Sequence, residues 1–261
     1  MNIKKSTSNN HGNSRFVAHR GFTEKYPENT LLAIQSAIDV GAQFVEVDIQ
    51  LSKDLQPVLF HDRDLVRLCN QKQSIHNYTL KEIQEFSNFS PDRFGDKYKG
   101  EAIPTLKTLV SLIKKYPEVI IFIELKRISI EQFNVDEMLK AVLPTVDSII
   151  NQCVFISYSL ECIEAIRQQT SFSVGVVIDS WETAKTTEIK RLEKINPEYF
   201  FCDIESLPST GTLSLLNCKL AVYECTDLQQ AALVLQQGVE LVETFDIKKM
   251  LANFKPVNES K

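Results

Sequence analysis

The strongest constraint on the fold is a regular alternation of short apolar runs with helix-like segments along almost the whole chain of 261 residues. The runs are rich in Val, Ile, Leu and Phe, a pattern that is typical of strands buried on both faces of a parallel sheet. Eight of them open a strand–helix unit, at residues 16–19, 43–51, 119–126, 153–157, 173–178, 199–203, 219–224 and 240–244. Eight such units predict an α/β fold closed into a (β/α)8 TIM barrel, for which about 250 residues are typical.

An open, doubly wound sheet is the main competing architecture. The rhythm is broken once, at about residues 62–103, where apolar periodicity is weak and polar stretches such as SNFSPDRFGDKYKG occur. We interpret this segment as a small insertion after the second strand that lies over the barrel mouth, where long loops commonly contact substrate. The expected organisation is a disordered polar arm at residues 1–14, followed by a single domain at residues 15–255.

Composition narrows the possible partners and location. The net charge of −5, without a sustained run of Lys or Arg, argues against nucleic acid as a partner. No stretch approaches the roughly 18 apolar residues of a transmembrane segment, and the polar start of the chain does not resemble a secretory signal. The six cysteines are scattered without C-x-x-C spacing, which favours a reducing environment. We therefore expect a cytoplasmic protein, with export by a non-classical route left open and the oligomeric state unassigned.

Acidic residues fall near the predicted carboxyl ends of neighbouring strands. Glu46 and Asp48 are two residues apart on one strand and therefore share a face, and Glu124 and Lys126 repeat that spacing on the next. In a closed barrel these side chains would gather at one mouth, where three carboxylates repel one another unless a divalent cation lies between them. Because all the ligands are oxygens, Mg²⁺ or Ca²⁺ is expected rather than Zn²⁺.

Two basic residues accompany these acids. Arg20 follows the first strand, and Lys126 ends the strand that carries Glu124. Both would place positive charge beside the cation, where the non-bridging oxygens of a phosphate diester require it. A simpler interpretation of Lys126 is a salt bridge with Glu124 or Asp48, and the two interpretations are compatible.

Two histidines at strand ends form a candidate acid–base pair. His19 ends the first strand, and His61 follows the short apolar run at residues 57–60. Displacement at a phosphodiester requires one group to take a proton from the nucleophile and another to give one to the leaving alkoxide. Imidazole can do either near neutral pH. The other two histidines, His11 and His76, lie in the polar arm and in the inserted segment.

Several other residues are ambiguous. Asn29 and Thr30 precede a predicted helix and either cap it or take part in the site. Asp203 is a weaker candidate ligand at the end of a strand. Trp181 or Tyr223 could pack against an organic ligand, but core packing is the expected role of both.

The order and spacing of the motifs over residues 16–126 resemble those of the glycerophosphodiester phosphodiesterase family. The resemblance rests on H-R-G, P-E-N-T, E-V-D-I-Q-L-S-K-D, P-V-L-F-H-D, I-P-T-L and E-L-K, at residues 19–21, 27–30, 46–54, 57–62, 103–106 and 124–126. The second half of the chain resembles the family more loosely, through Ser157 and Tyr223.

The resemblance implies a (β/α)8 barrel and a specific set of roles. It implies metal-dependent hydrolysis of a small glycerophosphodiester to sn-glycerol 3-phosphate and an alcohol, through a cyclic phosphate. The implied site consists of the catalytic pair His19 and His61, the ligands Glu46, Asp48 and Glu124 of one Mg²⁺ or Ca²⁺, and the phosphate-binding residues Arg20 and Lys126.

Departures from the family pattern leave the alcohol head group unassigned. The family usually has an arginine followed by two threonines where this chain has residues 67–69, RLC, and tends to have Thr-Asp where this chain has residues 244–246, TFD. Tyr223 stands where tryptophan is common. Two other functions stay open: a lyase of the lysophospholipase D or sphingomyelinase D type, which the polar insertion disfavours, and a barrel that binds glycerophosphodiesters without catalysis.

Overall fold

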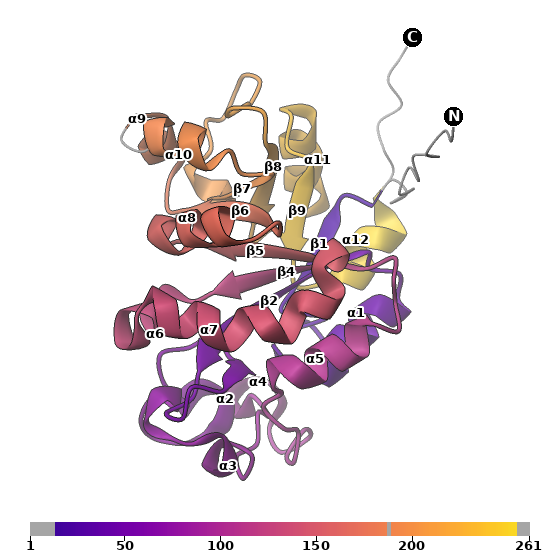
Figure 1. The fold of residues 1–261 in the computed structure, drawn as a ribbon. Helices are drawn as coiled ribbons and strands as arrows, with labels where there is room; N and C mark the ends of the chain where they lie inside the picture. Colours follow the sequence, from indigo (N-terminus) through magenta and orange to yellow (C-terminus); the bar gives the residue numbers. More distant parts are fainter. Residues whose placement is uncertain (1–13, 187–188, 255–261) are drawn as a thin grey trace, which may run out of the picture.

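Eight parallel strands pair into a closed barrel in the computed structural model, which describes residues 14–186 and 189–254 (Figure 1). Neighbouring strands follow the chain order, and the last pairs with the first. The strands are β1 (Phe16–His19), β2 (Phe44–Leu51), β4 (Ile120–Leu125), β5 (Cys153–Ser157), β6 (Ser173–Ile178), β7 (Tyr199–Asp203), β8 (Lys219–Tyr223) and β9 (Leu241–Thr244). The predicted TIM barrel is confirmed and the open sheet is wrong. The predicted arm lies outside the described residues, apart from Ser14.

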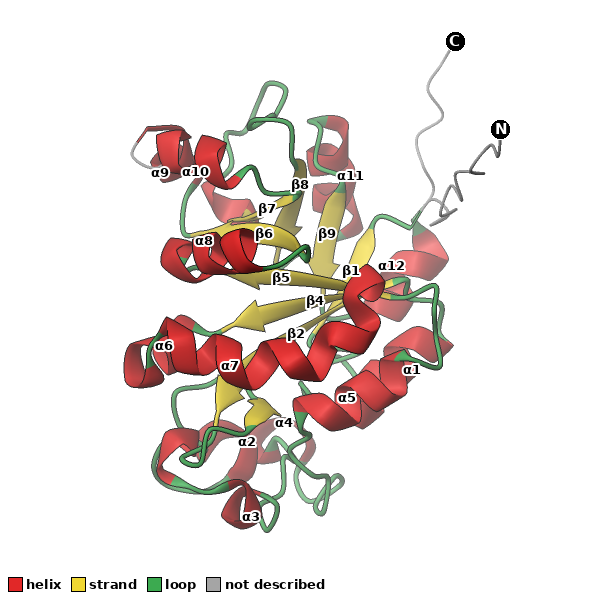
Figure 2. Ribbon diagram, in the orientation of Figure 1, coloured by secondary structure: helices red, strands yellow, loops and turns green. Residues whose placement is uncertain are grey.

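Helices surround the barrel on its outside (Figure 2). They are α1 (Leu31–Asp39), α5 (Leu106–Ile113), α6 (Arg127–Phe133), α7 (Val135–Val146), α8 (Leu160–Gln169), α9 (Trp181–Thr186), α10 (Ile189–Ile195), α11 (Leu228–Gln236) and α12 (Ile247–Asn253), with the 3₁₀ helices η2 (Asp147–Gln152) and η3 (Ile204–Ser206). Side chains of Thr30, Thr105 and Ser159 accept hydrogen bonds from the first turns of α1, α5 and α8. These caps satisfy amide groups that the helix itself leaves without acceptors, so they determine where each helix begins.

Alternate residues of each strand face two separate apolar layers. Outward residues such as Ala18 and Val45 pack against the helices. Inward residues fill the barrel with a second cluster, made of Val17, Phe44, Phe122, Val154, Ile156, Val177, Phe201, Ala221 and Leu241. The barrel is therefore a packed core rather than a pore, and polar residues near the carboxyl ends of the strands rest on an apolar floor.

The inserted segment is more ordered than its weak periodicity indicates. The short strand β3 (Pro57–Leu59) pairs antiparallel with β2, and four short helices follow: α2 (Val66–Cys69), η1 (Ile75–Asn77), α3 (Leu80–Ile83) and α4 (Pro91–Phe94). They gather below the barrel in the view of Figure 1. They enclose an apolar cluster of their own: Val58, Phe60, Leu65, Leu68, Cys69, Ile75, Ile83 and Ile103. One-turn helices supply too few apolar residues for a helical period to show in the sequence.

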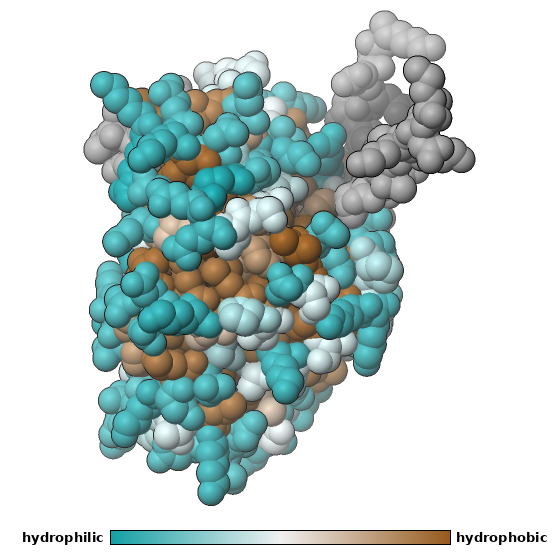
Figure 3. Space-filling model, in the orientation of Figure 1, coloured by the Kyte–Doolittle hydropathy of each residue, from teal (hydrophilic) through white to brown (hydrophobic). Residues whose placement is uncertain are grey.

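Hydrophilic residues cover most of the face drawn in Figure 3, and hydrophobic residues gather in a band between α8 and α7. Among the described residues, no helix has the length and apolar character needed to cross a membrane.

Candidate active site

A pocket of about 300 Å³ at the carboxyl ends of the barrel strands collects the residues that the sequence singled out. Asp48 is 1% exposed and lies against this lining, with Arg20 Nε and Lys126 Nζ each 3.1 Å from its carboxylate. The structure therefore brings all seven candidates together from β1, β2, β4 and the residues around them. Six of them line the pocket directly: His19, Arg20, Glu46, His61, Glu124 and Lys126.

The tight turn after β1 explains why the H-R-G triplet ends in glycine. Arg20 has a φ of 57° and Gly21 a φ of 90°, so the chain reverses directly after His19. A Cβ atom on Gly21 would lie 2.7 Å from the backbone carbon of Ala33, which leaves room only for glycine. The left-handed conformation of Arg20 costs about 1–3 kcal/mol. In return the turn aims the Arg20 N–H at the Glu46 carboxylate, to which it donates at 3.1 Å.

His19 is enclosed by an aromatic ring and a carboxylate. Its ring stacks on Phe245 with centroids 5.0 Å apart, and its Nε2 lies 3.7 Å from Glu46 Oε2. Burial, reinforced by the positive charge of Arg20, lowers the pKa of His19 well below its ordinary value. The imidazole is therefore neutral near pH 7, with one ring nitrogen able to accept a proton.

Three carboxylates from β2 and β4 converge in the pocket. Glu46, Asp48 and Glu124 each offer an oxygen, and these oxygens lie within 4.8 Å of one another. Burial raises the pKa of Glu46, and the charge of Asp48 raises it further. Burial acts in the same direction on Asp48, but Lys126 and other nearby positive charges outweigh it and hold the pKa of Asp48 well below its usual range. Glu46 Oε1 accepts no hydrogen bond from any described residue. An all-oxygen set with an unpaired buried acceptor fits a hard divalent cation.

The two basic residues are ion-paired with the acids. Lys126 Nζ lies 3.1 Å from Asp48 Oδ1 and 2.9 Å from Glu124 Oε1, so the salt bridge considered for Lys126 is present with both acids. Arg20 pairs with Asp48 and with Glu28, at 3.1 and 3.0 Å. Since both basic side chains also line the pocket, they are positive charges that an anion entering it would meet.

Two residues of the P-E-N-T segment make different contacts, one with helix α1 and one with Asp48. Thr30 accepts a hydrogen bond from Ala33 N at 3.1 Å and so caps α1. Asn29 donates from Nδ2 to Asp48 Oδ2 at 2.8 Å and accepts from the Asp48 N–H at 3.1 Å. Thr30 therefore caps α1, whereas Asn29 is hydrogen-bonded to one of the three acids.

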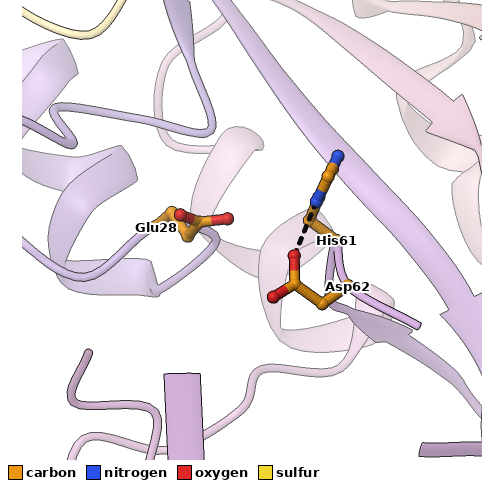
Figure 4. Close-up of side chains that lie close together, drawn as sticks. All are labelled: Glu28, His61 and Asp62. Atoms are coloured by element: carbon orange, nitrogen blue, oxygen red, sulfur yellow. Dashed lines mark hydrogen bonds and ion pairs between the residues drawn. The ribbon is translucent and has the colours of Figure 1, made fainter. Parts of the chain in front are cut away.

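A second polar cluster orients His61 (Figure 4). His61 Nδ1 lies 2.8 Å from Asp62 Oδ1, while the Glu28 carboxylate points toward the pair. Arg67 joins the two acids, donating to Asp62 at 2.7 Å and to Glu28 at 2.7 and 2.8 Å. Burial raises the pKa of Asp62, but hydrogen bonds from His61 and Arg67 outweigh it and lower this pKa. Every carboxylate oxygen of Glu28 and Asp62 thus has a partner, whereas Glu46 Oε1 has none among the described residues, so this cluster is a poorer cation site than the three carboxylates.

Comparison with known proteins identifies the family. The model described as the glycerophosphoryl diester phosphodiesterase family matches residues 19–207. The chain belongs to this family. Its fold matches that of an Oleispira antarctica phosphodiesterase solved in complex with the product sn-glycerol-3-phosphate, with a TM-score of 0.81, 23% identity, and coverage of 92% of this chain and 96% of the other. The Thermotoga maritima glycerophosphodiester phosphodiesterase gives a TM-score of 0.71 at 26% identity, covering 93% and 99%.

Curated relatives in the glycerophosphoryl diester phosphodiesterase family match over shorter stretches. The glycerophosphodiester phosphodiesterase of Caldanaerobacter subterraneus is 39% identical over 97 residues, which cover 37% of this chain and 39% of that relative. Glycerophosphodiester phosphodiesterase 1 of Bos taurus is 28% identical over 193 residues, covering 73% and 57%. The chain thus spans between 39% and 57% of the length of these two family members.

One pocket residue of this family member was missed in the sequence. Glu243 on β9 is 3% exposed and lines the pocket beside the three carboxylates. The signal was present, because an acid inside the apolar run L-V-E-T has the same character as Glu46 inside FVEVDIQL. Arg67 was noted only as a departure from the family pattern, and its contacts depend on how the insertion folds back.

The weaker candidates separate clearly. Tyr223 lines the pocket, and its hydroxyl donates to the Ile178 carbonyl at 2.8 Å. Trp181 is 1% exposed and packs edge-on against Phe200, so it belongs to the core. Asp203 accepts a hydrogen bond from Glu205 N and caps η3, and it is not part of the pocket lining.

Two further cavities are larger than this pocket. One of about 480 Å³ adjoins it and includes Arg67 and Arg93 of the insertion, which therefore does reach the mouth. The other, of about 520 Å³, lies between the insertion and α6, and His76 is the titratable imidazole in its lining. None of the seven candidate site residues lines the cavity of about 520 Å³. The smaller pocket is therefore the better candidate for the active site.

Proposed function

We propose that this chain hydrolyses glycerophosphodiesters to sn-glycerol 3-phosphate and an alcohol with the help of one divalent cation, Mg²⁺ or Ca²⁺. The observation that carries the proposal is the convergence of two histidines, three acids and two basic residues on one pocket. Membership of the family supports it. The Oleispira antarctica phosphodiesterase, whose fold this chain shares, was solved with that product.

In this proposal the three carboxylates hold the cation and the basic side chains hold the phosphate. A bound divalent cation would lower the pKa of an attacking hydroxyl and offset negative charge on a phosphate oxygen. Arg20 and Lys126, now paired with Asp48, Glu28 and Glu124, would turn part of their charge to the non-bridging oxygens. The surrounding carboxylates keep both basic groups charged and in place before substrate arrives.

His19 and His61 would move the protons. The 2-hydroxyl oxygen of the glycerol attacks phosphorus, the bond from phosphorus to the alcohol oxygen breaks, and a cyclic phosphate forms. One histidine takes the hydroxyl proton, and the other gives a proton to the departing alkoxide. Water then attacks the cyclic phosphate with the two roles reversed, which opens the ring to sn-glycerol 3-phosphate and restores both histidines. Asp62 would position His61 by its bond to Nδ1.

Neither alternative function gains a specific observation. A lyase acting on lipids needs an apolar groove, whereas this pocket is lined mainly by charged and tyrosine side chains. A binding barrel would have the same geometry and differs only in lacking turnover. We also propose a reducing, cytoplasmic compartment, because all six cysteines are free thiols.

The test is release of sn-glycerol 3-phosphate by the purified protein. Glycerophosphocholine, glycerophosphoethanolamine and glycerophosphoinositol would each be incubated with Mg²⁺, with Ca²⁺ and with a chelator, and the product read by a coupled dehydrogenase assay. Product with at least one diester that disappears with chelator supports the proposal. Binding of the diesters without product would contradict it in favour of the non-catalytic barrel.

A further inference from the structure

Glu243 is the one buried carboxylate of the pocket to which the proposed chemistry gives no role. It is 3% exposed, and its Oε1 accepts no hydrogen bond from any residue in the described part of the chain. Burial and the charge of Glu124 raise its pKa well above the ordinary value. A buried polar group without a hydrogen-bond partner destabilises a fold. Glu243 therefore lacks a hydrogen-bond donor within the described residues, and a bound molecule could supply one.

The position of Glu243 in the barrel indicates which part of the substrate could donate a hydrogen bond to it. Its oxygens are not among the group of Glu46, Asp48 and Glu124 oxygens that lie within 4.8 Å of one another. It comes instead from β9, which pairs with β1, and it lines the pocket together with Tyr158 and Tyr223. If the three carboxylates of β2 and β4 hold the cation and the phosphate lies beside it, the part of the pocket lined by Glu243, Tyr158 and Tyr223 is left for the organic part of the substrate.

The glycerol moiety is the part that reaches this depth. In the proposed reaction the alcohol leaves first and must depart through the open mouth, while the glycerol stays attached to phosphorus. The glycerol therefore occupies the inner part of the pocket, where Glu243 lies over the apolar floor. Its secondary hydroxyl is the nucleophile, which leaves the primary hydroxyl as the free donor on that moiety.

We propose that Glu243 is a specificity-determining residue that accepts a hydrogen bond from the free primary hydroxyl of the substrate's glycerol. The inference rests on the proposed function and assigns one residue of the pocket to the recognition of the glycerol moiety. A carboxyl group has an acceptor oxygen whether or not it is protonated. A substrate without this hydroxyl would leave the buried carboxyl unpaired, which is how polar pockets reject analogues that lack a hydroxyl.

The test compares two substrates that differ by one hydroxyl. These are glycerophosphocholine and its 1-deoxy analogue, the phosphocholine diester of propane-1,2-diol, whose secondary hydroxyl is kept as the nucleophile. The wild-type protein is expected to favour the glycerol diester by about 10- to 10²-fold in kcat/KM, the range that an unpaired buried acceptor produces. Glu243→Leu should reduce this preference to within about threefold by slowing only the glycerol diester. Glu243→Gln should retain part of the preference, because an amide oxygen still accepts a hydrogen bond.

The controls separate specificity from folding and from cation binding. Asp179→Asn removes an exposed carboxylate that lines the same pocket, and it should leave the preference unchanged. The cation concentration for half-maximal activity should be the same in both Glu243 variants as in the wild type. If Glu243→Leu fails to give a cooperative thermal transition, Glu243→Gln is the test, with a partial loss confined to the glycerol diester.

Three outcomes would overturn the inference: equal wild-type rates on the two diesters, an equal loss on both in the variants, or a raised cation requirement. The last would make Glu243 part of cation binding instead. A wild-type protein that turns over neither diester would refute the proposed function. Equal turnover of both diesters would refute only the role of Glu243.

Discussion

The two halves of the barrel contribute different kinds of residue to one pocket. The first half, β1 to β4 with the segment between them, supplies both histidines, three acids and both basic residues. Ion pairs of 2.9–3.1 Å connect these acids and basic groups. The second half, β5 to β9, supplies Tyr158, Tyr223 and Glu243, the exposed acids Asp179 and Glu224, and apolar side chains. Its buried carboxylate has an oxygen without a partner among the described residues.

In the proposed function, this difference would separate the residues that carry out the chemistry from those that select the substrate. Charged side chains that already form ion pairs are held in fixed positions. Groups that stabilise a transition state must be held in this way. An unpaired polar group and aromatic rings are better suited to recognising what the substrate adds. Substitutions in the first half should therefore change turnover and cation dependence, and those in the second half should change the preference among substrates.

The largest effect is expected from removing either histidine. His19→Ala and His61→Ala should each lower turnover by about 10²–10⁴-fold, because each would remove one proton transfer. The steady-state rate on glycerophosphocholine is the measurement, with circular dichroism to confirm the fold. His76→Ala is the matched control, since His76 packs on Phe133 outside the pocket and its loss should change the rate less than threefold. Near wild-type rates in both pocket variants would refute the assignment.

Removing one acid of the proposed cation site should have the next largest effect. Glu46→Gln should weaken the cation first, so calorimetric titration with Ca²⁺ and Mg²⁺ should show a loss of affinity of about tenfold or more. Excess cation should then partly restore the rate. The same substitution should raise the melting temperature of the cation-free protein, since a buried like charge is removed. An unchanged affinity for both cations would exclude Glu46 as a ligand.

A smaller effect is expected from Arg67, which positions His61 through Asp62. Arg67→Leu should lower turnover about tenfold and the free energy of unfolding by about 1 kcal/mol, because Arg67 is partly exposed. Arg67→Lys should fall between, since an ammonium group cannot form the two-pronged contact. A variant with unaltered turnover would show that His61 is held in place without this contact.

The stability difference caused by Arg67→Leu should also depend on pH. Burial raises the pKa of Glu28 and of Asp62, but their hydrogen bonds outweigh it, so both have lowered values in the folded protein. Their contribution is therefore complete above the ordinary carboxyl pKa of about 4 and is lost as pH falls below it. Urea unfolding of both proteins should show a gap that narrows from pH 6 to pH 3. A constant gap would contradict this coupling.

The smallest effect is expected from Tyr223 in the second half. Tyr223→Phe removes a hydroxyl that donates to the Ile178 carbonyl and accepts from Tyr158 at 2.9 Å, but it keeps the ring. Stability should fall by about 1 kcal/mol, with less than a threefold change in turnover. Thermal unfolding and the steady-state rate measure the two effects. A loss of turnover above about tenfold would bring this tyrosine into the chemistry and weaken the contrast between the halves.

The same contrast explains what could be predicted from the sequence. The barrel was predictable because each strand is an apolar run buried on both faces, and Glu46, Asp48 and Glu124 stood out as acids within such runs. Glu243 carries the same signal on β9. The signal is weaker there because β9 has only four residues, L-V-E-T, and lies outside the family motifs at residues 19–126.

Other features required the folded chain. Arg67 reaches Glu28 across 39 residues of sequence, through an insertion whose one-turn helices leave no periodic pattern. The pairing of Lys126 with two acids depends on the register between β2 and β4, in which Asp48 lies opposite Glu124. Contacts of this kind follow from strand register and loop path, which residue spacing within one segment does not determine.

The most direct test of the account is a ³¹P NMR time course of glycerophosphocholine with the purified protein and Mg²⁺ or Ca²⁺. We predict that the diester signal is replaced by that of sn-glycerol 3-phosphate, with any cyclic phosphate signal transient, and that a chelator stops the change. A cyclic phosphate that persists, or conversion that continues at the same rate with chelator present, would contradict a cation-dependent hydrolase at this pocket.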